Sequence, residues 1–411
     1  MRQWIKVYGN SRVLSVLGLG FSSGLPLALT GATLQAWMVT EAVDLRVIGI
    51  FSLVALPYTL KILWAPLMDR YTPSLLGRRR GWILITQIML GGAIAFLALT
   101  SPGSMPVAVA VLALLVSFFS ASQDIVVDAY RTDVLRPHEL GAGAATAVLG
   151  YRLAMLTSGA LAMILSDHLS WHAVYSIMAA LMLFNVLFTI LAPEPTDQVV
   201  PPKSIQEAVW GPLSAYFSRS GAVAMLLFIV LFKLGDVIAA AMTTPFLLDL
   251  GFNRTEVGAV YKAFGLASTI FGALAGGAIM ARIGLNRSLW IFAILQAVSN
   301  LTFTFLALVG KSYPIMVGAV AIENICGGMG TAGFVAFLMS LCDKRFTATQ
   351  YALLTSLMGL TRVLAGVPTG FMVQAFGWSL FYTISVIGAL PAILLLPRFA
   401  PWNNRSLEGR S

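Results

Sequence analysis

Long apolar runs dominate this chain, and each is about the length a helix needs to cross a lipid bilayer. A run of roughly 20 apolar residues spans the hydrocarbon core as an α-helix. The chain is 58% hydrophobic and only 10% charged, whereas soluble domains carry roughly 25% charged residues. We therefore predict an all-α polytopic membrane protein with twelve transmembrane helices, at about residues 13–39, 47–66, 81–100, 106–130, 143–166, 172–192, 222–248, 256–281, 288–309, 314–341, 348–372 and 378–397.

Lysine and arginine are distributed unevenly among the loops that join these runs. One set of alternate loops holds most of them, and the other holds only Arg46, Arg254 and Lys311. Because basic loops stay in the cytoplasm, we predict that both termini are cytoplasmic. The asymmetry also accounts for the net charge of +9 without nucleic acid as a partner. The first run is too long for a signal peptide, and Cys326 and Cys342 lie in or near one run, which argues against a disulfide framework.

Residues 194–221 form the longest polar stretch, and Pro195, Pro201 and Pro202 interrupt helix formation at its start. We interpret it as a cytoplasmic linker, part of which can lie on the membrane surface as an amphipathic segment. It separates an N-terminal six-helix half (1–193) from a C-terminal six-helix half with a cytoplasmic tail (222–411). Landmarks recur at offsets of 209 to 211 positions, which suggests duplication with both copies in one orientation: Gly24 with Gly235, Gly49 with Gly258, Asp133 with Asp343 and Arg152 with Arg362.

The loop after the second run carries Asp69-Arg70 and then Gly77-Arg-Arg-Arg80. This resembles the loop signature of the major facilitator superfamily, although Pro66 stands near the usual leading glycine and extra residues separate the two parts. The resemblance implies the major facilitator fold, with two pseudo-symmetric six-helix halves and substrate bound between them near the midplane. Such a loop can form charge-assisted bonds between facing helix ends and hold one conformation. The alternative is a plain basic loop.

Further motifs occur in both halves: Gly24-Leu-Pro-Leu-Ala-Leu-Thr30, Leu34-Gln-Ala-Trp-Met38, Leu63-Trp-Ala-Pro66, Ser122-Gln-Asp-Ile125, Gly150-Tyr-Arg-Leu153, Phe232-Lys-Leu-Gly-Asp236 and Glu323-Asn-Ile-Cys-Gly-Gly-Met-Gly330. They resemble the AmpG-type muropeptide permeases of Gram-negative bacteria over nearly the whole chain. The resemblance implies a proton-coupled secondary transporter of the inner membrane. It would import GlcNAc–1,6-anhydro-muropeptides from periplasm to cytoplasm, for cell-wall recycling and β-lactamase induction. Some members of the family carry two further spans after the twelfth.

Two other classes of function are weighed against this one. Another major facilitator carrier, for acetyl-CoA, sugars or drugs, would use the same scaffold. An intramembrane enzyme or a receptor would usually show clustered histidines or aspartates at one membrane face, or added soluble domains, and neither is evident. The run Gly328-Met-Gly-Thr-Ala-Gly333 fits a dinucleotide-binding pattern, but it lies inside a span, so close helix packing explains it better. We predict a monomeric carrier in membrane lipid that is not an enzyme, binds no metal and needs no cofactor beyond the proton gradient.

Ionisable residues inside the runs are the candidates for function, because a charge in hydrocarbon costs several kcal/mol or more unless it meets water or a partner. Asp236 lies one helical turn from Lys233, and protonation of its carboxyl would free the lysine. The alternative is a pair that only neutralises itself. Glu323 and Asp124 are further candidates for proton coupling, although a structural bond from Asp124 to Arg152 is an equal alternative for that residue.

Binding of a muropeptide needs cations for its carboxylates and polar or aromatic groups for its sugars. The cation candidates are Lys61, Arg152, Lys233 and Lys262. The sugar-binding candidates are Gln35, Trp37, Gln123, Tyr151, Tyr261, Gln296, Asn300 and Asn324. Trp37 is equally well explained as an anchor at the membrane interface. The gating candidates are Asp69, Arg70, Asp128, Arg131, Asp133 and Arg362, with Asp128 expected to clamp Arg70.

Overall fold

The computed structural model describes residues 7–43, 47, 51–195, 201–218, 221–253, 256–366 and 368–402, and within these ranges the chain is helical and forms no β-strand. Helices are expected here, because in lipid every backbone N–H and C=O must find a partner within the protein. The first part of the chain forms η1 (Val7–Gly9), α2 (Ser11–Thr30), α3 (Ala32–Thr40), η2 (Phe51–Ala55), α5 (Leu56–Leu60), η3 (Lys61–Leu63), α6 (Ala65–Arg70), α7 (Arg78–Ala98), α8 (Pro106–Val134), η4 (Pro137–Glu139), α9 (Leu140–Met155), η5 (Leu156–Leu161), α10 (Ala162–Ser166), α11 (Trp171–Phe184) and α12 (Val186–Leu191).

The second part begins with a helix inside the stretch predicted as a linker. Its helices are α13 (Ile205–Phe217), α14 (Ala222–Phe232), α15 (Leu234–Asp249), η6 (Val257–Phe264), α17 (Gly265–Ile283), α18 (Leu285–Ser299), α19 (Leu301–Val309), α20 (Tyr313–Leu341), α21 (Thr347–Gly366) and α22 (Thr369–Phe399). Ser204 caps α13 by accepting a hydrogen bond from the backbone N–H of Glu207, and Ser170 caps α11 in the same way. Gly377, at a φ of 71°, kinks α22.

The predicted all-α architecture is confirmed, and two of the twelve predicted spans differ from the rest. Among the described residues, ten helical segments are long and apolar enough to cross a membrane. The predicted second span is a series of short helices, η2, α5, η3 and α6, and the predicted eleventh span corresponds to α21. The π-helical segment η5 lies within the fifth span, and η6 forms the start of the eighth span. These irregular turns leave no mark on a hydropathy pattern, so the sequence could not reveal them.

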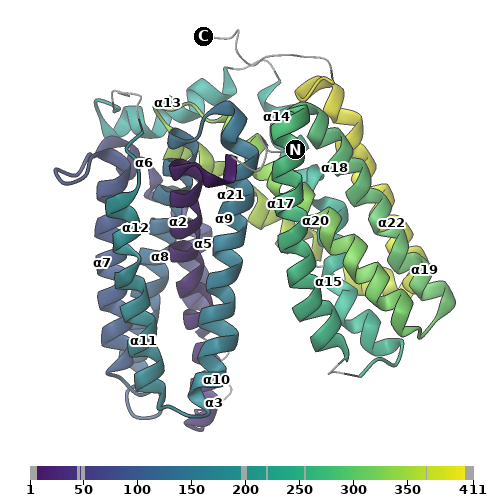
Figure 1. Ribbon diagram of the computed structural model, residues 1–411, viewed down its shortest axis with the longest axis horizontal. Coiled ribbons are helices and arrows are strands. Elements are labelled where there is room, and N and C mark those ends of the chain that lie inside the picture. The colour runs from purple at the N-terminus through teal and green to yellow at the C-terminus, as the bar shows by residue number, and fades with distance from the viewer. Residues whose placement is uncertain are drawn as a thin grey trace.

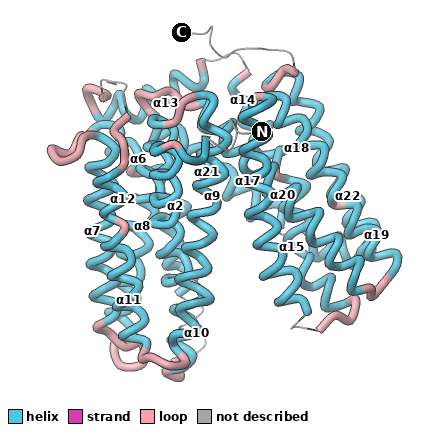
Figure 2. Tube along the Cα trace, viewed as in Figure 1, coloured by secondary structure: helices cyan, strands magenta, loops and turns pink. Residues whose placement is uncertain are grey.

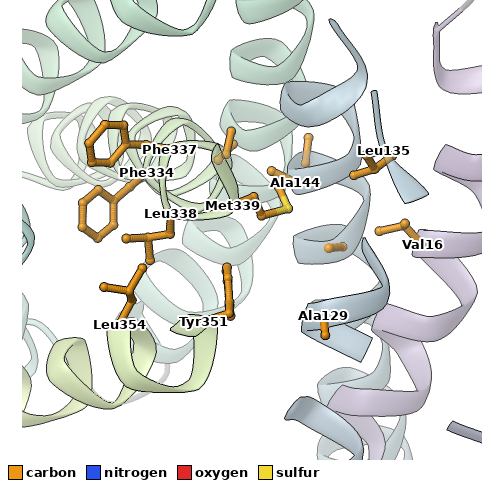
Figure 3. Packing of buried hydrophobic residues seen from close by; sticks show 14 of the residues in the cluster. Val16, Ala129, Leu135, Ala144, Phe334, Phe337, Leu338, Met339, Tyr351 and Leu354 are labelled. Atoms are coloured by element: carbon orange, nitrogen blue, oxygen red, sulfur yellow. The ribbon is translucent and has the colours of Figure 1, made fainter. Parts of the chain in front are cut away.

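The helices form two bundles that meet at one end and diverge toward the other (Figures 1 and 2). We name the end at which α6 and α13 lie the terminal end, and the opposite end the distal end. One apolar core joins both bundles at the terminal end, from Val16 in α2 to Leu396 in α22. Figure 3 shows Met339 of α20 extending toward Ala144 of α9 across this junction. Two further cores, one around Trp37 and one around Phe246, each belong to a single bundle. The structure is therefore closed at the terminal end.

Glycines bring helices into close contact inside each bundle, as predicted for the small residues. A Cβ atom on Gly24 of α2 would lie 2.5 Å from the Tyr151 carbonyl oxygen of α9. A Cβ on Gly272 of α17 would overlap the Ile325 carbonyl oxygen of α20, and one on Gly328 would overlap the Thr269 carbonyl oxygen. These contacts join the first span to the fifth and the eighth span to the tenth.

A tryptophan ties the last span to the first span at the distal end of each bundle. Trp171 of α11 donates its indole N–H to the Thr40 hydroxyl oxygen at 2.9 Å. Trp378 of α22 donates to Asp249 Oδ2 at 2.6 Å. The two tryptophans are separated in sequence by nearly the same offset that relates the two halves. The same is true of the two acceptors, Thr40 and Asp249. The recurrence agrees with two copies of one six-helix unit.

Candidate functional site

The seventh span is broken where its lysine lies. Helix α14 ends at Phe232 and α15 begins at Leu234, with Lys233 between them at φ −101° and ψ 0°. The next small residue, Gly235, lets α15 pass close to α22. A Cβ atom on Gly235 would lie 2.6 Å from the Ser385 carbonyl oxygen. The interruption is one residue long, and the Lys233 carbonyl oxygen still accepts from the Val237 N–H at 3.0 Å. Many transporters place ion and substrate sites where a span is interrupted.

Lys233 joins two helices. Its ammonium donates to Asp236 Oδ2 at 3.1 Å, which confirms the predicted pairing within one turn. It also donates to Thr331 Oγ1 of α20 at 3.2 Å. Thr331 was not among the predicted site residues. Its contact with Lys233 depends on how two helices pack, which the sequence does not show.

Glu323 lies two turns before Thr331 on α20. Its Oε2 accepts a hydrogen bond of 2.7 Å from the Asn324 amide, and Asn324 Oδ1 accepts one of 2.9 Å from Thr269 of α17. Glu323 interacts electrostatically with both Asp236 and Lys233. Gly327 lies between Glu323 and Thr331, and a Cβ there would meet no atom within 4 Å. This face of α20 therefore opens onto free space and carries a carboxylate at one end and a hydroxyl at the other.

Tyr261 and Lys262 lie in the π-helical segment η6 of the eighth span. The Lys262 ammonium lies 4.7 Å from the centre of the Tyr261 ring, in a cation–π contact. Lys262 is exposed, unlike Lys61 of the other half. Short π-helical segments inside α-helices are frequent at functional sites.

The first bundle contributes a second polar group. Lys61 is buried at the start of η3 and interacts electrostatically with Asp124 of α8, which also bonds to Ser23. Beside them, Tyr58 donates to Ser120 Oγ at 2.8 Å and Trp64 donates to Ser122 Oγ at 3.0 Å. The structure thus brings Lys61 to an acid from a different helix, which spacing within one helix could not show. Arg152 lies half-buried on α9.

The predicted sugar-binding residues fall into two groups. Gln35 is exposed on α3, and Tyr151, Tyr261 and Asn324 are half-buried. The others are buried within one bundle in this conformation: Trp37, Gln123, Gln296 and Asn300. Trp37 packs on Tyr175 with ring centres 4.9 Å apart, and its indole donates to Glu41 Oε1 at 2.6 Å. Gln123 donates to Ser22 inside the first bundle. In this state these four side chains contribute to packing.

The predicted loop signature forms the centre of the closed terminal end. Asp69 is fully buried and accepts from Arg78 at 3.1 Å and from Arg79 at 3.0 Å. Its Oδ2 also accepts from the backbone N–H of Thr349 at 2.8 Å and from the Thr349 hydroxyl at 2.7 Å. Thr349 belongs to the first turn of α21 in the other half. One carboxylate therefore bonds to both halves. Its negative charge lies at the N-terminus of α21, where the helix dipole stabilises it.

The neighbouring gate candidates extend this contact. Asp133 accepts from Arg79 Nε and from the Thr347 hydroxyl, each at 2.7 Å. Arg131 pairs with Asp128 at 2.9 Å and donates to the Tyr351 hydroxyl of α21. The expected clamp between Asp128 and Arg70 is wrong in this state. Asp128 takes Arg131 from its own helix, while Arg70 lies over the Tyr71 ring at 5.5 Å. The side chain of the last gate candidate, Arg362, lies outside the described residues.

Helix α13 completes the closed end, and its residues were missed as site candidates. Arg345 pairs with Glu207 at 2.8 Å, and its carbonyl oxygen accepts from Arg78 at 2.7 Å. Gln350 donates to the Pro212 carbonyl oxygen at 3.3 Å. Trp210 and Phe217 are exposed on α13, opposite its buried face of Ala208 and Tyr216, as an amphipathic helix at a membrane surface requires. The polar turn Ser204-Ile-Gln-Glu207 at the start of an apolar run was the available signal.

Comparisons with known proteins agree with this architecture. The family model described as Major Facilitator Superfamily matches residues 16–236 and 225–411. The "Anhydromuropeptide permease" of Escherichia coli (strain K12) is 52% identical over 396 residues, which cover 96% of this chain and 81% of that protein. The "Putative transporter AmpG 1" of Rickettsia conorii is 32% identical over 406 residues, which cover 94% of this chain and 97% of that one.

Two solved structures show the same fold at low sequence identity. The transporter FucP in its outward conformation has a TM-score of 0.71 and 14% identity, over 97% of this chain and 100% of that one. The proton:xylose symporter XylE has a TM-score of 0.69 and 9% identity, over 97% and 96% of the two chains. The chain is thus a multi-pass membrane transporter and not an enzyme, and it belongs to the major facilitator superfamily and, within it, to the family of AmpG-type permeases.

Proposed function

We propose that this protein imports anhydro-muropeptides across the bacterial inner membrane, with both termini in the cytoplasm and as a monomer in lipid. The observation that carries the proposal is the 52% identity, over 96% of the chain, with a relative named for that substrate. Imported muropeptides would supply cell-wall recycling and the signal for β-lactamase induction. Likeness to carriers of sugars and other molecules extends only to the fold.

The charges of the spans support an anionic substrate. The carboxylates of a peptide stem need cations in a region from which water is partly excluded. Lys262 is exposed beside the Tyr261 ring, which suits simultaneous contact with a carboxylate and an apolar sugar face. Lys61 and Arg152 of the other half are the further cation candidates. The substrate would then bridge the two halves.

Proton coupling is part of the same proposal and needs no cofactor. Asp236 is neutralised by Lys233. Glu323 bonds to the Asn324 amide and forms no ion pair with any of the described residues. A carboxylate in a span gains most from taking up a proton when no cation neutralises it. The geometry therefore favours Glu323 as the proton carrier, ahead of Asp236 and Asp124.

The closed terminal end supports the direction of transport. If the basic loops lie in the cytoplasm, the halves are sealed there and diverge toward the periplasm, which is the state that receives a periplasmic substrate. Asp69, Arg79 and Asp133 would then be the gate that has to separate when the substrate is released. Arg131 with Tyr351 would be a second contact of the same gate.

Uptake by purified protein in vesicles tests the proposal. Radiolabelled anhydro-muropeptide should accumulate when the outside is acidic, and a protonophore should abolish the accumulation. Glu323→Gln should lose accumulation and keep exchange across equal concentrations, because the site still binds substrate. The peptide-bearing ligand should compete better than the peptide-free disaccharide. Absence of accumulation in the wild type, or equal competition by acetyl-CoA or xylose, would reject the proposed substrate.

A further inference from the structure

Thr331 lies in the glycine-rich run 328–333, and its hydroxyl contacts the proposed proton site. Its hydroxyl donates to the Gly327 carbonyl oxygen one turn earlier at 2.7 Å. Since its only hydrogen is used there, its oxygen can only accept the 3.2 Å bond from Lys233. The donor and acceptor roles are consistent, so Thr331 is a fixed acceptor aimed at the ammonium.

The bond crosses from the broken seventh span to the tenth. Lys233 lies at the break between α14 and α15, where it terminates one helix and begins the next. Without Thr331, the hydrogen-bond partner left to the ammonium among the described residues would be Asp236 of its own span. With Thr331 it is also held against α20, at a position two helical turns from Glu323. The face of α20 between Glu323 and Thr331 is open at Gly327, so the ammonium has room to move along it.

We propose that Thr331 is a positioning residue for proton coupling: it holds the Lys233 ammonium beside Asp236 and two helical turns away from Glu323. The proposal deepens the proposed function and rests on it. Held there, the ammonium forms no contact pair with Glu323, which stays able to take up a proton. Loss of the Glu323 proton and a movement of the ammonium along α20 toward that carboxylate are then linked events. The seventh and tenth spans would respond together to one proton.

Other ionisable groups interact with Glu323: Tyr261 on η6, Cys326 on α20 and Tyr382 on α22. Lys262 lies next to Tyr261 in η6 and contacts its ring. Thr331 differs from all of them, because it bonds directly to Lys233 and does not titrate.

The test compares four proteins in the same vesicles: wild type, Thr331→Val, Thr331→Ser and Thr302→Val. Valine keeps the shape of threonine and removes the acceptor, whereas serine keeps the hydroxyl. Thr302 is a matched control, since it is half-buried and its hydroxyl bonds back to its own helix through the Ser299 carbonyl oxygen. Two readouts are taken as a function of pH: the infrared carbonyl band of protonated carboxyl groups that Glu323→Gln removes, and the rate of gradient-driven muropeptide uptake.

In Thr331→Val the ammonium should be released to move along the open face of α20 toward Glu323, so Glu323 should lose its proton at lower pH. The midpoint of the infrared titration and of the uptake profile should both fall by about 0.5 pH unit or more. Thr331→Ser and Thr302→Val should match the wild type. Midpoints unchanged in Thr331→Val, or shifted equally in Thr302→Val, would overturn the proposal. If Thr331→Val is not monodisperse, Thr331→Ala carries the same comparison.

The two readouts separate this inference from the proposed function. The infrared titration needs no substrate, so it reports on Thr331 even if the wild type transports no muropeptide. A shifted infrared midpoint without wild-type uptake would reject the substrate and retain the positioning role. Normal wild-type uptake with unshifted midpoints would retain the transporter and reject the role of Thr331.

Discussion

The acidic side chains of this protein differ in the number and kind of partners that they bind. The Asp69 carboxylate collects two guanidinium groups and the first backbone N–H groups of α21. Asp236 has one lysine, and Glu323 has a neighbouring amide. A carboxylate with many bonds across a junction serves as a structural contact. A sparsely bonded carboxylate is better placed to exchange a proton, so the number of partners separates the proposed gate from the proposed coupling residue.

Glu41, outside the spans at the distal end, gives a pH-dependent prediction. Burial opposes its ionisation, but hydrogen bonds from Ser101, from the Gly103 N–H and from Trp37 lower the pKa of its carboxyl below the ordinary 4.5. A group with a lowered folded pKa stabilises the fold above its unfolded pKa, and this stabilisation is lost as the pH falls through the folded value. The melting temperature should therefore fall on acidification below about 4.5, and Glu41→Gln should flatten this fall.

Thermal unfolding of detergent-purified protein between neutral pH and pH 3 checks the Glu41 prediction. Asp167→Asn is the control, because Asp167 is an exposed carboxylate in the neighbouring distal loop. A Glu41→Gln protein whose melting temperature follows that of the wild type through the acidic range would show that the carboxylate contributes nothing there.

At the scale of helices, the sequence predicts features that lie within one segment and misses contacts made between helices. The apolar runs sufficed for ten of the twelve predicted spans, because hydropathy is a property of each segment alone. The pairing of Lys233 with Asp236 was also predictable, since both lie on one turn. Arg79 was not a candidate, although it joins Asp69 to Asp133. Its role depends on where α6 and α8 lie relative to α7, which no single-segment pattern contains.

Two adjacent glycines on α20 give a prediction about helix packing. A Cβ on Gly328 would overlap the Thr269 carbonyl oxygen of α17, whereas a Cβ on Gly327 would meet nothing within 4 Å. Gly328→Ala should therefore push α20 from α17 and destabilise the second bundle by about 1–3 kcal/mol. Gly327→Ala should be neutral or stabilise by up to about 1 kcal/mol, because alanine restricts the unfolded chain and favours helix.

Denaturant unfolding of the two glycine variants in mixed micelles measures both changes side by side. Their neighbouring positions make Gly327→Ala a matched control for expression, detergent and helix propensity. Equal stability of the two variants would mean that α17 and α20 adjust without cost, and that the close approach at Gly328 is not a constraint.

At the scale of the whole molecule, the two bundles share one core and keep one core each. Separate distal cores let each bundle move as a rigid body, while the shared core and the Asp69 contacts hold the terminal end closed. Transport requires that these terminal contacts break and that new distal contacts replace them. Every bond that crosses the terminal junction therefore biases the equilibrium between the two states, including bonds made by residues outside the spans.

Tyr8 makes such a bond from the N-terminal segment. Its hydroxyl, in η1 of the first half, donates to the Leu274 carbonyl oxygen of α17 in the second half at 2.6 Å. Gly277 leaves the space, since a Cβ there would lie 2.5 Å from the Tyr8 hydroxyl oxygen. Burial raises the pKa of Tyr8 to about 12, so the hydroxyl remains a donor at neutral pH. Tyr8→Phe should remove about 1 kcal/mol from the closed terminal end and favour the opposite state roughly five-fold.

Spin labels at Asp167 and Lys311, exposed at the distal ends of the two halves, report this equilibrium as a distance distribution. In Tyr8→Phe the shorter distance, from molecules closed at the distal end, should gain population relative to the wild type. Tyr71→Phe is the control, because Tyr71 is half-exposed at the same end and its ring contacts Arg70 of its own half. The same distribution in Tyr8→Phe as in the control would mean that the N-terminal segment follows the motion without biasing it. A population gain specific to Tyr8→Phe would make this segment part of the gate, because phenylalanine keeps the ring packing and removes only the bond between the halves.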